Sequence, residues 1–196
     1  MSRVPPRDRS EVPGLALYFS SLEERMGFLP TSMLVMAHRP ELVRAVAELA
    51  KVVYDPEAKT SRQLRNLVGH VASRAAGCMY CSAHTASNST RSGIEDQKLA
   101  DVWEFETSPH FTEAERVALR FAQHGAVVPN AVTDVDVAEL EKHYDHQEIV
   151  EIMTVIAWFG FLNRWNDSLA TTLEDLPRAE AERTVARGGW TVGKHQ

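Results

Sequence analysis

The sequence predicts an all-α protein, a bundle of about seven to nine helices. Apolar side chains recur at intervals of three and four residues in several segments, which is the period of an amphipathic helix. Several of these segments follow a Thr or Asp that has Glu, Gln or Asp three residues later, a pattern typical of helix N-termini. No alternation of Val, Ile and Thr with period two persists for six residues, so no strand is expected.

The first clearly predicted helix begins at Pro40, because proline favours the first turn of a helix. The second begins with a capping box formed by Thr60 and Gln63, in which each residue would bind the backbone N–H of the other. Gly77 is expected to end that helix, since glycine is the preferred residue just past a helix C-terminus. Two cysteines then open the next helix, which should run to about Gly93.

Four further helices are expected at residues 95–106, after the pair Thr112 and Glu115, after the pair Thr133 and Asp136, and after the pair Asp145 and Glu148. The last of these contains the longest apolar run, residues 152–162, and should continue to about Leu173. This apolar run has eleven residues, whereas a membrane-spanning helix requires about 20. This run is therefore expected to form a buried helix.

The chain of 196 residues is long enough for one full-sized hydrophobic core. We expect a single helical domain over residues 14–175, with an N-terminal arm at 1–13 and a C-terminal tail at 176–196, either mobile or wrapped on a neighbour. The formal charge of −6 argues against a nucleic-acid or anionic-membrane surface. No apolar stretch follows the first residues, so no signal peptide is expected, and a cytoplasmic location is predicted.

The chemistry of the chain centres on its only two cysteines, Cys78 and Cys81, which form a Cys-x-x-Cys motif with His84 three residues further on. This spacing suits a dithiol that closes to a disulfide. On a helix the three residues share one side, so His84 could take the proton from Cys81, and a helix N-terminus would stabilise a thiolate at Cys78. A redox or catalytic dithiol is therefore the favoured interpretation.

Zinc is the first alternative, with Cys78, Cys81, His84 and a fourth ligand such as His70. Cys-x-x-Cys-x-x-His on one helix is not a usual zinc-finger spacing, so we expect no metal and no cofactor. Two inert, buried thiols are the second alternative.

Other candidate residues each allow a structural and a functional interpretation. Asn66 and His70 lie on one side of the preceding helix, opposite its apolar stripe, and either face solvent or line the redox pocket. Tyr80 either donates a hydrogen bond in the site or only packs. Glu151 is either a buried carboxylate in a proton relay or the end of the exposed part of its helix. The polar residues 163–167 indicate a buried hydrogen-bond network or a subunit contact more often than a site.

Over residues 25–170 the sequence resembles the AhpD-like alkylhydroperoxidase / carboxymuconolactone decarboxylase superfamily. The matching motifs are Gly27-Phe28-Leu29-Pro30, Pro40-Glu41-Leu42, Ala75 through Thr85, Phe111 through Arg116, and Phe159 through Arg164. The resemblance implies an AhpD-like helical bundle, a homo-oligomer (trimer or hexamer), and thiol-dependent reduction of hydroperoxides. By analogy Cys81 would be the peroxidatic cysteine and Cys78 the resolving one, with His84 in the proton relay. The decarboxylase branch generally lacks the cysteine pair.

The chain departs from the family pattern at three places. The family's relay histidine lies four residues after the second cysteine, whereas His84 lies three after Cys81. The family's relay glutamate falls on Asn66, which cannot carry a proton as a carboxylate does. The best-known members have a histidine between the cysteines, where this chain has Tyr80. A relay rewired through His70 or Glu151 would keep the activity.

The expected reaction begins with attack of the Cys81 thiolate on a small-molecule hydroperoxide, which gives a sulfenic acid. Cys78 then condenses with it to form the disulfide. An external dithiol reductant, a lipoyl group or a thioredoxin-like protein, would restore the thiols. The alternatives are a carboxymuconolactone decarboxylase-like acid–base enzyme, which would not need the cysteines, and a non-enzymatic dithiol redox sensor.

Overall fold

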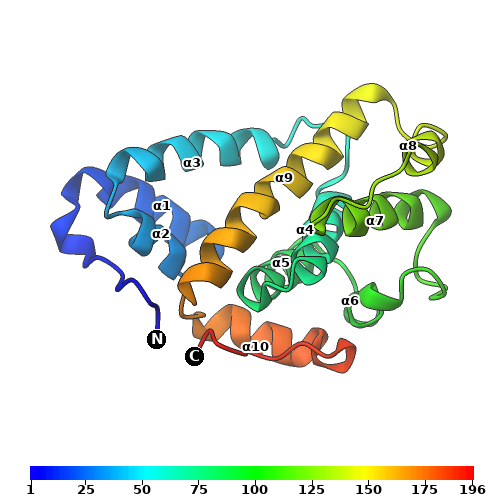
Figure 1. Ribbon diagram of the computed structural model, residues 1–196. Helices are drawn as coiled ribbons and strands as arrows, with labels where there is room; N and C mark the ends of the chain where they lie inside the picture. Colours follow the sequence, from blue (N-terminus) through cyan, green and yellow to red (C-terminus); the bar gives the residue numbers. More distant parts are fainter.

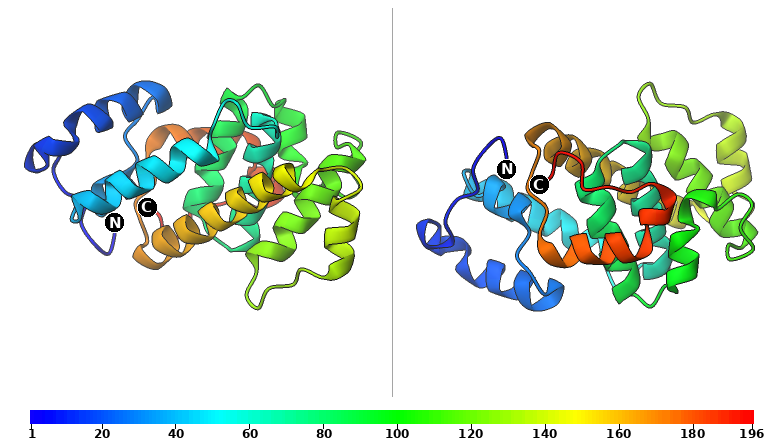
Figure 2. Two further views of the ribbon diagram at one scale, coloured as in Figure 1. Left: turned by 90° about the horizontal axis from the view of Figure 1, so that it is seen from above. Right: turned by 90° about the horizontal axis from the view of Figure 1, so that it is seen from below.

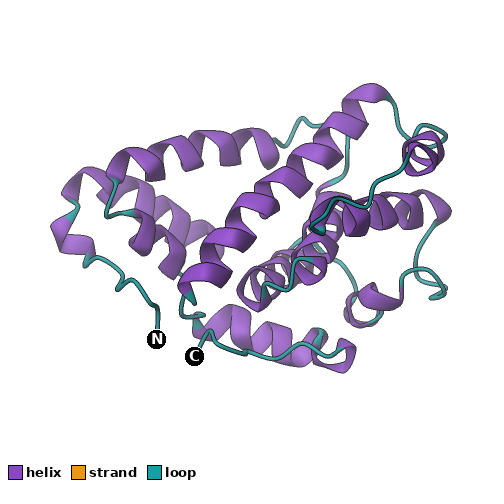
Figure 3. Cartoon of the chain, viewed as in Figure 1, coloured by secondary structure: helices purple, strands orange, loops and turns teal.

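The computed structural model describes all 196 residues, and they form helices and loops without any strand (Figure 3). The predicted all-α class is confirmed. The ten α-helices are α1 (Ala16–Met26), α2 (Thr31–Met36), α3 (Pro40–Val53), α4 (Arg62–Ala75), α5 (Met79–Arg91), α6 (Asp96–Ala100), α7 (Glu113–Ala126), α8 (Asp134–Leu140), α9 (His146–Leu169) and α10 (Asp175–Thr184). Four short 3-10 helices are η1 (Arg9–Glu11), η2 (Pro13–Leu15), η3 (Val102–Glu104) and η4 (Ala186–Gly188).

Most helix starts lie where the local signals predict them. Pro40 occupies the first turn of α3. The three predicted capping boxes at Thr112, Thr133 and Asp145 are all present, each with reciprocal side-chain and backbone hydrogen bonds. These starts depend on residues three apart in the chain, so the sequence alone specifies them.

The start of α4 differs by one residue from the prediction. Ser61, not Thr60, caps this helix, and its Oγ accepts a hydrogen bond from Leu64 N at 3.1 Å. The hydroxyl of Thr60 instead donates to Glu151 Oε2 at 2.8 Å. The Thr60 hydroxyl, which the sequence pattern assigned to the N-cap of α4, is therefore hydrogen-bonded to the distant Glu151 carboxylate.

Three further segments differ from the prediction. The expected single helix at 95–106 is divided into α6 and η3. Helix α9 ends at Leu169 rather than near Leu173, because Ala170 adopts the left-handed conformation with φ 47°. Helix α10 (Asp175–Thr184) begins at the last residue of the expected domain and takes up the first part of the expected tail, and it packs against α5.

Helix α4 lies at the centre of the bundle, in contact with α5, α7 and α9 (Figures 1 and 2). Every residue from Leu64 to Ser73 is buried. Gly69 allows α9 to approach closely, because a Cβ at this position would lie 2.4 Å from Cε2 of Phe159. The side of α4 that carries Asn66 and His70 therefore faces protein and not solvent.

Helices α1, α2 and α3 form a group at one end of the molecule, and α3 contacts α9 (Figure 1). The two chain ends lie close together: the Met1 ammonium donates to the Gln196 carbonyl, and Ser2 N donates to Thr172 Oγ1 at 2.9 Å. The final residues run back across α5 rather than away from the bundle (Figure 2). None of the helices combines the length and apolar character needed to cross a membrane.

Candidate functional site

The two cysteines lie at the turn between α4 and α5. Gly77, with φ 75°, ends α4: its N–H binds Arg74 O at 3.0 Å, and Cys78 N binds Ser73 O at 3.0 Å. This pair of hydrogen bonds is the Schellman motif that closes many helices. The chain then reverses, and Cys78 becomes the N-cap of α5, with its Sγ accepting a hydrogen bond from Cys81 N at 3.4 Å.

Cys81 lies one turn inside α5, and its thiol is enclosed by protein. Its Sγ accepts a hydrogen bond from Asn166 Nδ2 of α9 at 3.4 Å. Burial raises the pKa of the Cys81 thiol well above its ordinary value; the neighbouring Cys78 adds to this effect, and the Asn166 amide opposes it. Both cysteines are free thiols, and both are buried.

His84 points away from Cys81 toward a carboxylate of the C-terminal region. Its Nε2 lies 2.6 Å from Glu174 Oε2, and its ring stacks on Tyr80 with centroids 4.3 Å apart. Tyr80 donates its hydroxyl to Glu174 Oε1 at 2.8 Å. The structure therefore brings two predicted residues together around Glu174, which the sequence analysis did not identify.

Glu174 is an anion in this cluster. Its burial alone would raise its pKa, but the His84 charge and the hydrogen bonds from His84, Thr31 N and Tyr80 outweigh burial and hold the pKa below its ordinary value. Burial and the Glu174 charge raise the pKa of Tyr80 well above 10, so Tyr80 stays a neutral phenol. This cluster is consistent with a structural anchor beside the dithiol.

His70 and Asn66 are buried between α4 and α5, so their predicted solvent-facing alternative is wrong. His70 Nδ1 donates to Thr85 Oγ1 at 3.0 Å, and Thr85 Oγ1 donates to Cys81 O at 2.9 Å. His70 therefore reaches the backbone of Cys81 through Thr85. Asn66 Nδ2 donates to Asn88 O at 3.1 Å, further along α5.

Glu151 lies at the opposite end of α9 from the dithiol. It accepts hydrogen bonds from Thr60 N at 2.8 Å and Lys59 N at 3.1 Å. It is fifteen residues from Asn166, about 22 Å along the helix at 1.5 Å per residue. The structure does not bring Glu151 together with the cysteines.

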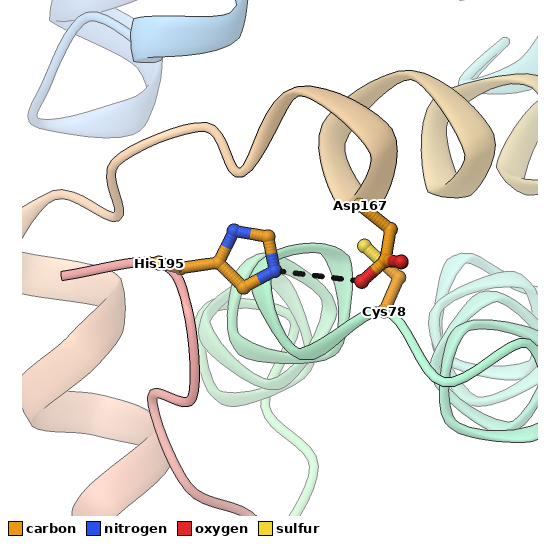
Figure 4. Close-up of side chains that lie close together, drawn as sticks. All are labelled: Cys78, Asp167 and His195. Carbon is orange, nitrogen blue, oxygen red and sulfur yellow. Dashed lines mark ion pairs between the residues drawn. The ribbon is translucent and has the colours of Figure 1, made fainter. Parts of the chain in front are cut away.

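A second cluster surrounds Cys78 and includes a residue from the C-terminal segment (Figure 4). Cys78 Sγ, a carboxylate oxygen of Asp167 and a ring nitrogen of His195 all lie within 4.8 Å of one another. His195 Nε2 is 3.8 Å from Asp167 Oδ1, and its Nδ1 donates to the Thr171 carbonyl at 2.8 Å. Sequence reasoning missed His195, because nothing near it in the chain indicates a partner.

The zinc alternative is not supported by this geometry. His84 is directed to Glu174 and His70 to Thr85, so the four predicted ligands do not converge. The cluster around Cys78 offers three donor atoms, one fewer than a structural zinc site uses, and Asp167 Oδ2 is also paired with the Lys194 ammonium at 2.7 Å.

A surface groove of about 430 Å³ lies next to the turn that carries Cys78. Its walls are the end of α4, residues 126–128 and one side of α9, with Asp167 among the lining residues. Asn163 also lines it, and both its amide nitrogen and its amide oxygen are buried without a hydrogen-bond partner. The predicted polar segment 163–167 thus supplies Asn163, Asn166 and Asp167 to the site.

Comparison with known proteins finds solved structures that resemble nearly the whole chain. The chain is 35% identical to the debrominase Bmp8, with a TM-score of 0.86 over 92% of this chain and 97% of Bmp8. A cysteine-to-alanine variant of Bmp8, solved in complex with 2,3,4-tribromopyrrole, aligns with a TM-score of 0.85. A peroxidase-related protein of Ralstonia eutropha JMP134, described as an alkylhydroperoxidase AhpD core, shares the fold with a TM-score of 0.81 at 20% identity, over 90% of this chain and 94% of that chain.

A sequence relative and a family model match the central part of the chain. Protein YnjA of Escherichia coli strain K12 is 29% identical over 122 residues, which are 62% of this chain and 66% of YnjA. The model of the carboxymuconolactone decarboxylase family matches residues 40–124, which include α4, α5 and both cysteines. The chain belongs to the carboxymuconolactone decarboxylase family and has the AhpD-like helical fold.

Proposed function

We propose that this protein is a dithiol oxidoreductase that reduces a small organic electrophile, and that the electrophile is an organic hydroperoxide. The observation that carries the proposal is the pair of free thiols at the N-terminus of α5, linked by the hydrogen bond from Cys81 N to Cys78 Sγ. Cysteines spaced in this way can close to a disulfide within one helical turn.

The overall reaction consumes one hydroperoxide and two thiols. One thiolate attacks the terminal oxygen, the O–O bond breaks, and the alkoxide leaves as an alcohol after it takes up a proton. The resulting sulfenic acid condenses with the second thiol to give the disulfide and water. An external dithiol, of the lipoyl or thioredoxin-like class, then reduces the disulfide by thiol–disulfide exchange.

Reductive removal of bromine from an aromatic ring is a second candidate, favoured by the 35% identity to a debrominase over nearly its whole length. The same dithiol can supply the two electrons. A thiolate takes the bromine as a sulfenyl bromide, and the carbon left behind is protonated. The second thiol displaces bromide, so one aryl bromide and two thiols become the arene, the disulfide, bromide and a proton.

A single-turnover experiment tests both candidates without knowledge of the reductant. Pre-reduced protein is mixed with one equivalent of cumene hydroperoxide or, separately, of 2,3,4-tribromopyrrole. Mass spectrometry follows the thiols, and chromatography follows the alcohol or the debrominated pyrrole. Loss of two thiols for each alcohol formed supports the peroxidase, and the same ratio with released bromide supports the debrominase.

The cysteine variants provide the controls. Cys78→Ser and Cys81→Ser should each form no intramolecular disulfide and complete no second step. Thiols that stay reduced for many minutes with both compounds would overturn the reductase. Disulfide formation without alcohol or debrominated product would favour the redox sensor. Lactone decarboxylation that survives in the double variant would favour the acid–base enzyme.

A further inference from the structure

We propose that His195 is the base that activates Cys78, and that Cys78 rather than Cys81 is the thiol that attacks the substrate. This inference rests on the proposed dithiol chemistry and assigns its roles. It reverses the order expected from the family resemblance, in which Cys81 attacks and Cys78 resolves. Four features of the structure support it: the tautomer of His195, the packing of its segment, the environment of Cys81 and the position of the groove.

The hydrogen bonds of His195 leave a lone pair directed at the dithiol. Because Nδ1 lies 2.8 Å from the Thr171 carbonyl, which can only accept, the ring proton of neutral His195 is on Nδ1. Nε2 therefore carries the lone pair. This atom is buried, has no hydrogen-bond partner, and faces Cys78 and Asp167 (Figure 4). A buried unpaired acceptor is costly, so one beside a thiol indicates a place for its proton.

The fold holds the segment that carries His195 in place. Leu173 N donates to the backbone carbonyl of His195 at 2.9 Å. Five residues before His195, Trp190 donates its ring N–H to Met79 O of α5 at 2.9 Å. These two hydrogen bonds, together with the one to the Thr171 carbonyl, hold His195 beside Cys78.

The charges around His195 suit a base that becomes an imidazolium. Burial lowers the pKa of His195, the Thr171 carbonyl and Asp167 oppose that effect, and the ring is neutral near pH 7. After proton transfer from Cys78, the imidazolium lies 3.8 Å from Asp167 Oδ1. The other titratable groups that act on it are Lys194 and His84, which lower its pKa, together with the neutral Tyr80 ring at 5.8 Å.

Cys81 has the properties of a resolving thiol. The group that the structure places against its Sγ is the Asn166 amide, which can donate a hydrogen bond but cannot accept a proton. Because no base lies against its Sγ, Cys81 keeps its proton until Cys78 has become a sulfenic acid. Condensation then sends that proton into the leaving water, and no base is needed at Cys81. His195 in turn gives its proton to the alkoxide released in the first step.

Neither cysteine lines the surface groove, but one of its walls adjoins the turn that carries Cys78. Ala75 and Ala76, which line the groove, immediately precede the Cys78 turn, and Asp167 belongs to both the groove and the His195 cluster. The unpartnered amide of Asn163 offers one donor and one acceptor to a bound molecule. These walls suit a small molecule with an apolar body and one polar group, bound next to the turn that carries Cys78.

Thiolate absorbance at 240 nm tests the proposal without any electrophile. In the Cys81→Ser protein, Cys78 is the only thiol, and its titration is compared with that of Cys81→Ser/His195→Asn. Asparagine can still donate to the Thr171 carbonyl but cannot take the proton. We expect His195→Asn to move thiolate formation to higher pH and to slow the single turnover at pH 7 by about 100-fold. Added imidazole should restore part of the rate to His195→Ala. His146→Asn, at a fully exposed position, is the matched control.

Each outcome bears on the assignment. An unchanged Cys78 titration in His195→Asn would overturn it. So would rapid peroxide oxidation of Cys81 in Cys78→Ser, or one zinc ion bound per chain in the purified protein, since a metal would occupy the lone pair. If neither thiol reacts with the peroxide but the titration still shifts, His195 is confirmed as the partner of Cys78 and the peroxidase is rejected.

Discussion

Mild acid should destabilise the protein through the buried imidazole of His70. This side chain is 1% exposed, and its burial, reinforced by the nearby Arg74 charge, lowers its pKa to about 3. In the unfolded chain the pKa returns to about 6.5. The unfolded state therefore binds one more proton than the native state between these values, and stability falls as the pH decreases from 6.5 toward 3.

The magnitude follows from the two pKa values. Each pH unit in this window costs about 1.4 kcal/mol, and integration from pH 7.5 to pH 5 gives a loss of about 2 kcal/mol from His70 alone. Glu174, Glu115 and Glu151 have lowered pKa values. The stabilisation that these carboxylates provide is complete above the unfolded pKa of about 4.3 and is lost only in stronger acid. A comparison of pH 7.5 with pH 5 therefore leaves their contribution out. His195, whose pKa is also lowered, adds to the loss in the native protein.

Urea unfolding followed by circular dichroism at pH 7.5 and pH 5, at one protein concentration, measures this difference. His70→Asn is the informative variant, because its amide can donate to Thr85 but takes up no proton. We expect the loss of stability between the two pH values to be about 2 kcal/mol smaller in His70→Asn than in the native protein. The exposed-site control His146→Asn should keep the native difference. An equal pH dependence in His70→Asn and the native protein would refute the reasoning.

Three further predictions concern packing, the Glu174 cluster and assembly. Gly69→Ala should lower stability by about 1–3 kcal/mol although alanine favours helices by about 1 kcal/mol, because the new Cβ would lie 2.4 Å from the Phe159 ring. A melting temperature at or above the native value would contradict this. Tyr80→Phe should cost about 1–3 kcal/mol in urea unfolding, because Ser32 N and Glu174 lose a partner, while single turnover continues; loss of turnover in a stable variant would instead make Tyr80 catalytic. We also propose a homo-oligomer, because large apolar side chains such as Val52 of α3 and Val150 of α9 are exposed. Light scattering should give a multiple of 21.9 kDa that falls in Val52→Glu, and a monomeric native protein would contradict it.

The helices could be predicted largely because their signals are local. The capping boxes, the proline of α3 and the glycine after α4 each act within four residues of the helix end. The predictions failed where a distant group intervened or a residue adopted a conformation its type disfavours. Glu151 takes the Thr60 hydroxyl, and Ala170 adopts a left-handed conformation that the sequence gives no reason to expect.

The site could be predicted only in part, for the same physical reason. The spacing of Cys78 and Cys81 determines that both lie on the first turn of one helix. The direction of His84 depends instead on Glu174, which is 90 residues away in the chain and forms a charge-assisted contact that no Cys81 thiol can match. His195 approaches through the packing of the last residues, which carry no helical period and no motif. The interrupted apolar pattern at 163–167 was the one local sign that α9 contributes polar groups.

The departures from the family pattern and the position of His195 have one common explanation. The positions that the resemblance assigns to a proton relay around the second cysteine hold Asn66, Tyr80 and Thr85, all neutral near pH 7. Each of these side chains already donates a hydrogen bond elsewhere. Asn66 donates to the Asn88 carbonyl, Tyr80 donates to Glu174, and Thr85 donates to the Cys81 carbonyl. No proton acceptor among them reaches the Cys81 sulfur. The imidazole with a free lone pair lies instead beside Cys78, and the groove adjoins the turn that carries this cysteine. We therefore propose that the base of this chain serves Cys78, one helical turn from the sulfur to which the resemblance assigns it.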